Sequence, residues 1–194
     1  MAFVDLEGKG NDFGLRVGYY GTTSKYKTYI QIVYPGSEAA TAKLERGDLI
    51  TEINGTKYGS NFDTESSALT NAFFHSTKIT IKGTKRTGEA FDITLNKTTY
   101  NTKSVLTDSV YTKDAKKIGY FAFNSFSSLT HTKADIDKSF SKFQTAGITD
   151  LIIDLRYNGG GYINTVQYLV NKIAPSSING KLMFSEHFNS TMQN

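Results

Sequence analysis

Hydrophobic and polar positions follow two different patterns along this chain. The first 96 residues contain short runs of β-forming residues that are broken by turn signals, at 13–20, 28–34, 49–53, 78–82 and 90–95. The last two runs flank a Lys-Arg-Thr-Gly turn and predict a β-hairpin. Apolar residues at helical spacing over 66–74 predict a single helix. We therefore predict a β-rich unit over residues 13–96.

The pattern changes after residue 117. It predicts a strand, a helix, a second strand and a second helix, at 119–123, 133–146, 151–155 and 162–173. The second strand is almost continuously apolar, as a parallel strand covered on both faces would be. For the first helix we predict a capping box at Thr132 and Asp135 and an end at Gly147. This order implies a parallel βαβ unit with a right-handed crossover.

These patterns predict the α+β fold class and four segments. Residues 97–116 are polar and rich in Thr, Lys, Asp and Ser, which is typical of a linker. The predicted organisation is an N-terminal segment 1–12, a β-rich unit 13–96, a linker 97–116 and an α/β unit 117–194.

Composition excludes several classes of function. The net charge is only +4, and the 22 Lys and Arg residues are scattered among 18 Asp and Glu, so we expect no nucleic-acid partner. The chain has no cysteine, which rules out disulfides, thiolate metal sites and a cysteine nucleophile. No run approaches the ~20 apolar residues of a membrane span, and no signal peptide opens the chain. The three histidines are isolated, so we expect no metal and no cofactor.

The strongest chemical signal lies at residues 151–161, where a strand runs into Gly159-Gly160-Gly161 and a helix follows. Glycines allow left-handed backbone, and backbone N–H groups that open a helix can point at a negative charge. These residues alone fit an anion site and a tight structural connection equally well. We expect Asp154, Arg156 and Asn158 to support the turn rather than to react.

Three segments of the β-rich unit resemble a PDZ domain of the bacterial protease type: Asp12-Phe13-Gly14-Leu15, residues 35–40 and residues 44–55, which end in Asn54-Gly55. PDZ domains bind an extended peptide as an added strand and hold its terminal carboxylate with backbone N–H groups. The resemblance implies a carboxylate loop and strand edge at Phe13, Gly14, Leu15, Arg16 and Val17, continuing to Tyr19. It implies an opposite helical wall at Ala68, Leu69, Ala72 and Phe73, where the alanines leave room for an apolar peptide side chain. The alternative is that these residues fill the unit's own core.

A PDZ-like unit followed by a strand at 118–126, a helix and residues 154–161 resembles the carboxyl-terminal processing (tail-specific) serine protease family. The resemblance covers about residues 13–175 and implies that 117–194 is the N-terminal part of a crotonase- or ClpP-like protease domain. It also implies that a backbone N–H of Gly160 or Gly161 contributes to an oxyanion hole. The family often has proline at the place of Gly159, so this turn departs from the usual pattern.

The family uses a serine nucleophile activated by a lysine, and both lie downstream of the glycine turn. Ser176, Ser177, Ser185 and Ser190 lie in polar, loop-like sequence. We therefore expect the catalytic serine and lysine to lie beyond Asn194 and this chain to be an inactive part of the enzyme.

The resemblance also implies a partner and a location. The partner is a protein or peptide substrate with a free C-terminus, and the location is the bacterial periplasm or cell envelope. The alternative to a protease is a non-catalytic peptide-binding or scaffold PDZ protein.

Overall fold

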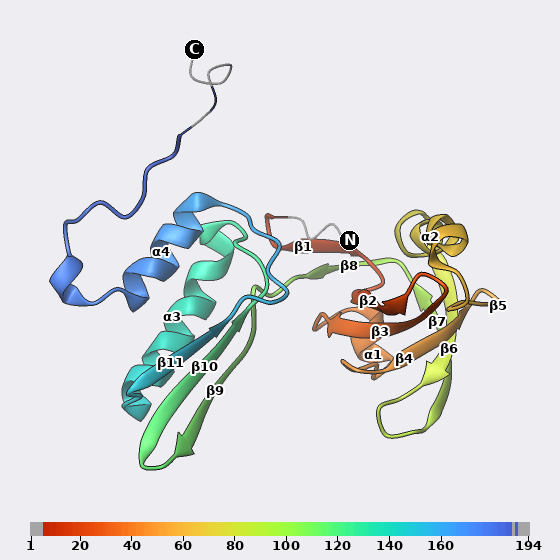
Figure 1. Cartoon of the computed structure of the whole chain (residues 1–194), viewed down its shortest axis with the longest axis horizontal. Helices are drawn as coiled ribbons and strands as arrows, with labels where there is room; N and C mark the ends of the chain where they lie inside the picture. The colour runs from red at the N-terminus through yellow and green to blue at the C-terminus, as the bar shows by residue number, and fades with distance from the viewer. Residues whose placement is uncertain (1–5, 188, 190–194) are drawn as a thin grey trace.

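The structure is a computed structural model that describes residues 6–187 and 189. Two units lie side by side, and an antiparallel ribbon of β1 (Lys9–Asp12) and β8 (Thr98–Asn101) runs between them (Figure 1). Several sheets and helices alternate along the chain, so the protein has a mixed α/β fold. No helix in the described residues is long and apolar enough to cross a membrane.

The N-terminal unit is built on a sheet with the strand order β2-β3-β4-β6-β7, in which β5 pairs with β4. The strands are β2 (Leu15–Thr22), β3 (Lys25–Val33), β4 (Leu49–Ile53), β5 (Thr56–Lys57), β6 (Lys78–Thr84) and β7 (Ala90–Asn96). The predicted turn at Asn54-Gly55 is confirmed, because both residues have positive φ between β4 and β5. The predicted β6–β7 hairpin is confirmed as well.

The core of this unit lies between one face of the sheet and its helices. Buried positions alternate along β3 and β6, as they do in a sheet with one solvated face. The helices are α1 (Glu38–Thr41), α2 (Phe62–Thr70) and the π-helix η1 (Asn71–His75). The predicted helix at 66–74 starts four residues too late, because the Asn61 side chain caps α2 by accepting the Asp63 and Thr64 N–H groups.

The C-terminal unit contains a three-stranded sheet in the order β11-β10-β9. The strands are β9 (Val105–Lys113), β10 (Lys116–Phe123) and β11 (Asp150–Asp154), and the helices are α3 (Leu129–Ala146), α4 (Ile163–Ile173) and the short 3₁₀ helix η2 (Ser176–Ile178). The predicted parallel pairing of β10 with β11 is confirmed. The predicted linker is not loop-like, since it contains β8 and all of β9. Its threonines and valines suit an edge strand that faces water.

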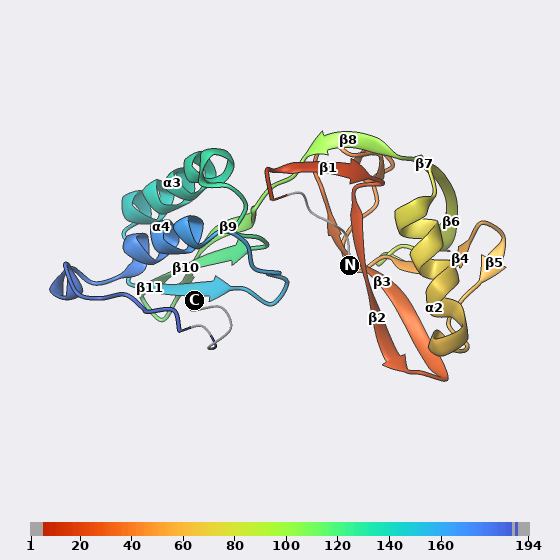
Figure 2. The same cartoon turned by 90° about the horizontal axis from the view of Figure 1, so that it is seen from above.

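Both helices of this unit cover the same face of the sheet (Figure 2). Ile153 packs with Phe121 under the helices, whereas Ile152 points to the other face and is 52% exposed. Tyr111 of β9 lies on that open face and is 56% exposed. The prediction that β11 is covered on both faces is therefore wrong, because the described residues supply helices to one face only.

The ends of α3 follow the predictions in part. Gly147 ends the helix in the left-handed conformation, as predicted. The capping box is wrong, since α3 begins after Ser128 and Thr132 lies inside its first turn. There the Thr132 hydroxyl donates to the Ser128 carbonyl over 3.1 Å, a bond within the helix.

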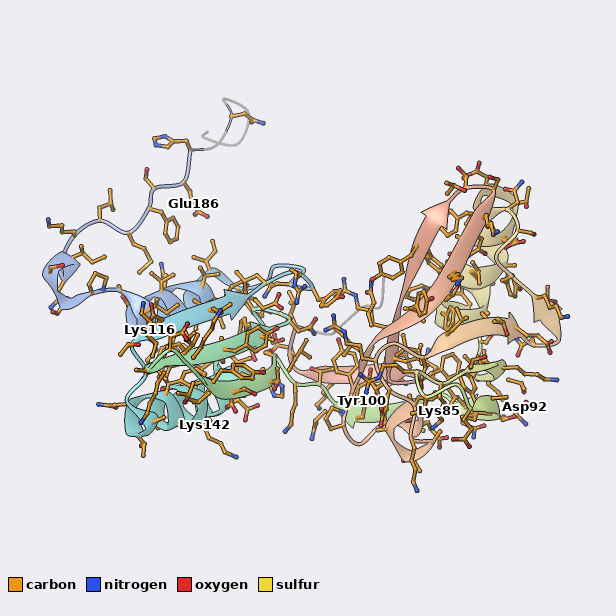
Figure 3. The ribbon with its side chains drawn as sticks, turned by 60° about the horizontal axis from the view of Figure 1, so that its bottom comes forward. Lys85, Asp92, Tyr100, Lys116, Lys142 and Glu186 are labelled. Carbon is orange, nitrogen blue, oxygen red and sulfur yellow. The ribbon has the colours of Figure 1, made fainter. Side chains whose placement is uncertain are left out.

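The segment before the N-terminal unit connects the two units through backbone hydrogen bonds. The Leu6 carbonyl accepts the N–H of Ser128 over 2.7 Å, and the Gly8 carbonyl accepts that of Thr102 over 2.8 Å. Tyr100 of β8 lies near the junction of the units (Figure 3) and stacks on Tyr34 of the N-terminal unit at 5.6 Å. The predicted segment 1–12 thus has a structural role at the junction from residue 6 onward.

Candidate functional site

The glycine turn, residues 154–161, begins where β11 ends. The Asp154 carboxylate accepts hydrogen bonds from the Arg156 guanidinium at 2.6 and 2.9 Å and from the Tyr120 hydroxyl at 2.5 Å. The Arg156 side chain, followed by the Tyr120 hydroxyl, holds the pKa of Asp154 well below its usual range. Asp154 is therefore a fixed anion at neutral pH, and its hydrogen bonds are used within the turn.

Asn158 ties the glycines to the chain that follows β10. Its amide nitrogen donates to the Phe123 carbonyl over 3.1 Å, and its amide oxygen accepts the Gly160 N–H over 2.8 Å. The Gly159 N–H donates to the Asn124 carbonyl over 3.3 Å. Two of the three glycine N–H groups are thus occupied within the turn.

The third glycine N–H is available. Among the described residues, the Gly161 N–H has no hydrogen-bond partner, and Gly161 is exposed. A side chain at this position would place its Cβ 2.1 Å from the Phe126 carbonyl oxygen, and φ is +142°. Only glycine fits here without strain. Of the two predicted oxyanion donors, Gly161 therefore has the free N–H group.

A second candidate site lies along β2, the edge strand of the N-terminal sheet. No strand in the described part of the chain pairs with its outer edge. A narrow cavity of about 40 Å³ lies beside it and is lined by Asp12, Phe13, Leu15, Arg16, Val17, Tyr19, Phe73 and Phe74. We call this cavity and the β2 edge the β2 groove. Four of the predicted groove residues, Phe13, Leu15, Arg16 and Val17, line it directly.

The helical wall of the β2 groove differs from the prediction. Leu69 and Ala72 are buried in the core of the unit, as the alternative interpretation had it, and Ala68 is exposed outside the cavity lining. The predicted wall residue Phe73 does line the cavity, together with Phe74 of η1. The π-helical turn changes the angular spacing of residues 71–75, so they do not continue the face set by α2.

The N–H group of Gly14 already has a hydrogen-bond acceptor within its own loop. The Gly14 N–H donates to the Asp12 carboxylate over 2.6 Å, and the Tyr100 hydroxyl donates to the same oxygen over 2.7 Å. Gly14 is the central residue of the predicted carboxylate loop. A peptide carboxylate would therefore meet a carboxylate already bound to this N–H.

The β2 groove and the glycine turn are joined by hydrogen bonds. The Arg16 guanidinium donates to the Tyr157 carbonyl over 2.8 Å and to the Asn124 amide oxygen over 3.5 Å. Arg46 lies 4.8 Å above the centre of the Tyr157 ring and donates to its hydroxyl over 2.9 Å. No local sequence signal indicates this link, because its partners are more than 100 residues apart.

Other chemistry finds little support in the described residues. No group of three or more metal-ligating side chains comes together there. The Ser185 hydroxyl lies 3.1 Å from His187 Nε2, but both residues are exposed, and no third group among the described residues orients the histidine. Ser190 lies outside the described residues. A Ser-His-Asp site needs a buried, oriented base, and this pair has none.

Comparison with known proteins identifies the family. The family model described as peptidase family S41 matches residues 117–186, which include the glycine turn. A carboxyl-terminal-processing protease from Picosynechococcus is 31% identical over 161 residues, 82% of this chain. This chain belongs to the carboxyl-terminal processing protease family, S41.

Two further similarities agree with S41 membership. A protein from Staphylococcus saprophyticus described as a CtpA-like serine protease is 28% identical over 80% of this chain. A solved structure of an S41 protease from Bacteroides fragilis has the same fold, with a TM-score of 0.65 at 23% identity over 88% of this chain and 46% of its own. The S41 chain described here spans 37% and 30% of the length of the two curated relatives.

Proposed function

We propose that this chain supplies the peptide-binding unit and one half of the active site of a serine endopeptidase. In this proposal the N-terminal unit is a PDZ-like module, and the β2 groove binds an extended protein segment as an added strand. The glycine turn then receives the scissile peptide bond. Protease names among the relatives and the S41 match over the glycine turn support the proposal.

The free Gly161 N–H is the observation on which the proposal rests. When a serine attacks a peptide carbonyl, the carbonyl oxygen gains negative charge. A preorganised backbone donor stabilises that charge by about 2.7–4 kcal/mol. Gly161 stands just before α4, so the positive end of the helix dipole adds to the effect.

Neither the nucleophile nor the base is identified among the described residues, so both are part of the proposal. From the family resemblance we assign them to a serine and a lysine that follow the glycine turn in sequence. A lysine acts as a base only when burial or neighbouring charges keep it neutral. Among the described residues, no serine after Gly161 lies beside a lysine that burial or neighbouring charges would keep neutral. We therefore expect no turnover by the 194-residue chain.

Strand addition at β2 supports substrate binding. Its outer edge offers unpaired backbone groups to an extended segment, the arrangement that β-augmentation requires. The resemblance implies a free C-terminus, with its carboxylate at the Gly14 loop. Asp12 opposes that carboxylate, so we propose that extended segments bind and that a free end binds only when Asp12 is displaced.

The test is peptide hydrolysis together with labelling by a serine-directed fluorophosphonate. We expect neither with the 194-residue chain, and both with the longer protein if the reading frame continues beyond Asn194. Turnover by the 194-residue chain would contradict the assignment of the nucleophile. A longer protein that binds peptides but neither turns over nor labels would contradict the protease.

The alternative function is a non-catalytic peptide-binding protein. One observation favours it: all residues that line the β2 groove belong to the N-terminal segment and unit, so binding requires no catalytic group. A reading frame that ends at Asn194, with intact peptide binding, would support this alternative. The envelope location rests on the resemblance and stays a prediction.

A further inference from the structure

A second cavity opens farther along β2. It has a volume of about 350 Å³ and is lined by Tyr19, Gly21, Thr22, Thr23, Tyr26 and Phe62. The first cavity of the β2 groove has only about 40 Å³. The second cavity is therefore the one with room for a large side chain in this conformation.

The walls of the second cavity are aromatic and held in place. The rings of Tyr19, Tyr26 and Phe62 lie 5.0–5.8 Å apart in pairs. The Tyr26 hydroxyl donates to the Glu65 carboxylate over 2.5 Å, and the Phe62 N–H donates to the Thr23 carbonyl over 2.7 Å. None of the described residues that line the cavity carries a charge. Such a site suits an apolar or aromatic group.

The two cavities are connected through β2. Tyr19 lines both of them. From Val17 to Thr22 the pairing of β2 with β3 runs without a register shift, so Val17, Tyr19 and Gly21 face the same way. Val17 lines the first cavity and Gly21 the second, four residues or roughly 13 Å farther along at ~3.3 Å per residue.

An added strand advances in step with the strand it joins. Side chains four residues apart on a bound peptide therefore point the same way and reach the two cavities, whereas spacings of three or five reverse one of them. We propose that the Tyr19–Tyr26–Phe62 cavity is a second subsite of the β2 groove, which takes an apolar or aromatic side chain four residues upstream of the anchor residue. The inference rests on strand addition at β2, as in the proposed function.

The experiment measures the binding of fluorescent nine-residue peptides to the whole chain. Each peptide carries a valine anchor near its C-terminus and either alanines throughout the rest or a single phenylalanine three, four or five residues upstream. We expect phenylalanine at four to tighten binding about tenfold over alanine, as burial of a large apolar side chain allows. At three and five we expect no gain.

Two variants and a matched control locate the subsite. Phe62→Ala removes one aromatic wall, and Thr23→Asp places a charge on the exposed rim without changing the core. Both should abolish the gain from phenylalanine while leaving the alanine peptide unchanged. Phe74→Ala, in the first cavity, should weaken all peptides equally and keep the gain. Circular dichroism of each variant checks the fold.

The outcomes separate the two proposals. Binding of the alanine peptide with no gain at four, with equal gains at all spacings, or with a gain that survives both Phe62→Ala and Thr23→Asp overturns the subsite and leaves the proposed function standing. No binding of any peptide overturns strand addition at β2, and the subsite with it.

Discussion

Gly14 and Gly160 lie in turns that are built alike, yet the two turns offer different chemistry. In each, the glycine N–H donates to a side-chain oxygen two residues earlier, Asp12 at 2.6 Å and Asn158 at 2.8 Å. The side chain that accepts the glycine N–H is a carboxylate in the first turn and a neutral amide in the second. The Gly14 turn is closely packed against Ser37, whereas nothing lies within 4 Å of a Cβ at Gly160.

This difference shows that a glycine turn is an anion site only when a donor is left over and no negative charge stands beside it. In the first turn Asp12 supplies the negative charge itself, so a second anion is repelled. In the second turn the amide occupies Gly160 without charge, and Gly161 keeps a free N–H. Both places have a glycine two residues after an Asp or Asn, and the charge of that side chain and the additional Gly161 distinguish the two turns.

The largest expected effect tests the packing of the two turns. Gly14→Ala puts a Cβ 1.9 Å from that of Ser37 at a positive φ, and we expect a loss of about 3 kcal/mol in the free energy of unfolding. Gly160→Ala meets no atom and should cost only about 1 kcal/mol for its positive φ. Urea unfolding followed by circular dichroism measures both. Equal losses would contradict the contrast in packing.

The next effect concerns the hydrogen bond between Arg16 of β2 and the second turn. Arg16→Ala removes a charged donor to the Tyr157 carbonyl, and we expect the free energy of local opening of the second turn to fall by about 1.5 kcal/mol. Hydrogen exchange at the Asn158 and Gly160 amides reports it, with roughly tenfold faster exchange. Arg46→Ala, which removes only contacts with the half-buried Tyr157 side chain, is the control and should change exchange less.

A smaller effect tests the charge in the first turn. Asp12→Asn keeps an oxygen for the Gly14 N–H and removes the negative charge. Two charges 4 Å apart in water repel by about 1 kcal/mol, so the preference for a peptide acid over its amide should rise about fivefold. Titration of paired acid and amide peptides against both proteins gives the ratio. An unchanged ratio would mean that Asp12 does not oppose the peptide's end.

The smallest expected effect is the pH dependence of the stability that Asp154 contributes through the second turn. The Arg156 and Tyr120 bonds lower the pKa of Asp154, so its contribution to stability is present above the unfolded value of about 3.9 and is lost as pH falls through the lower folded pKa. The difference in unfolding free energy between wild type and Asp154→Asn should be constant from pH 7 to 5 and shrink below pH 4. A difference that grows on acidification would contradict the assignment.

Much of the fold could be predicted because local signals carry it. The strand at 49–53, its Asn-Gly turn and the parallel pair β10–β11 follow from alternation, turn residues and element order. The strand β9 was missed because an edge strand with a polar face has the composition of a loop. The open face of β11 was missed because an apolar run does not say what covers it.

The sites could be predicted less well, because they depend on contacts between distant residues. The glycines were visible in the sequence, but which N–H stays free depends on hydrogen bonds to Asn124 and Asn158. The groove wall keeps the predicted Phe73 but has Phe74 in place of Ala68 and Ala72, and both phenylalanines lie in a π-helical turn, for which the sequence carries no recognised signal.

The segment 6–12 has a practical consequence for work on the groove. Cutting the chain at residue 13, the boundary that composition suggests, would remove β1 and the Asp12 carboxylate together. Strand β8 would lose its partner, and the Gly14 N–H would lose its acceptor. An excised fragment of that kind would bind carboxylates more readily than the intact chain and would report a specificity that the intact chain lacks.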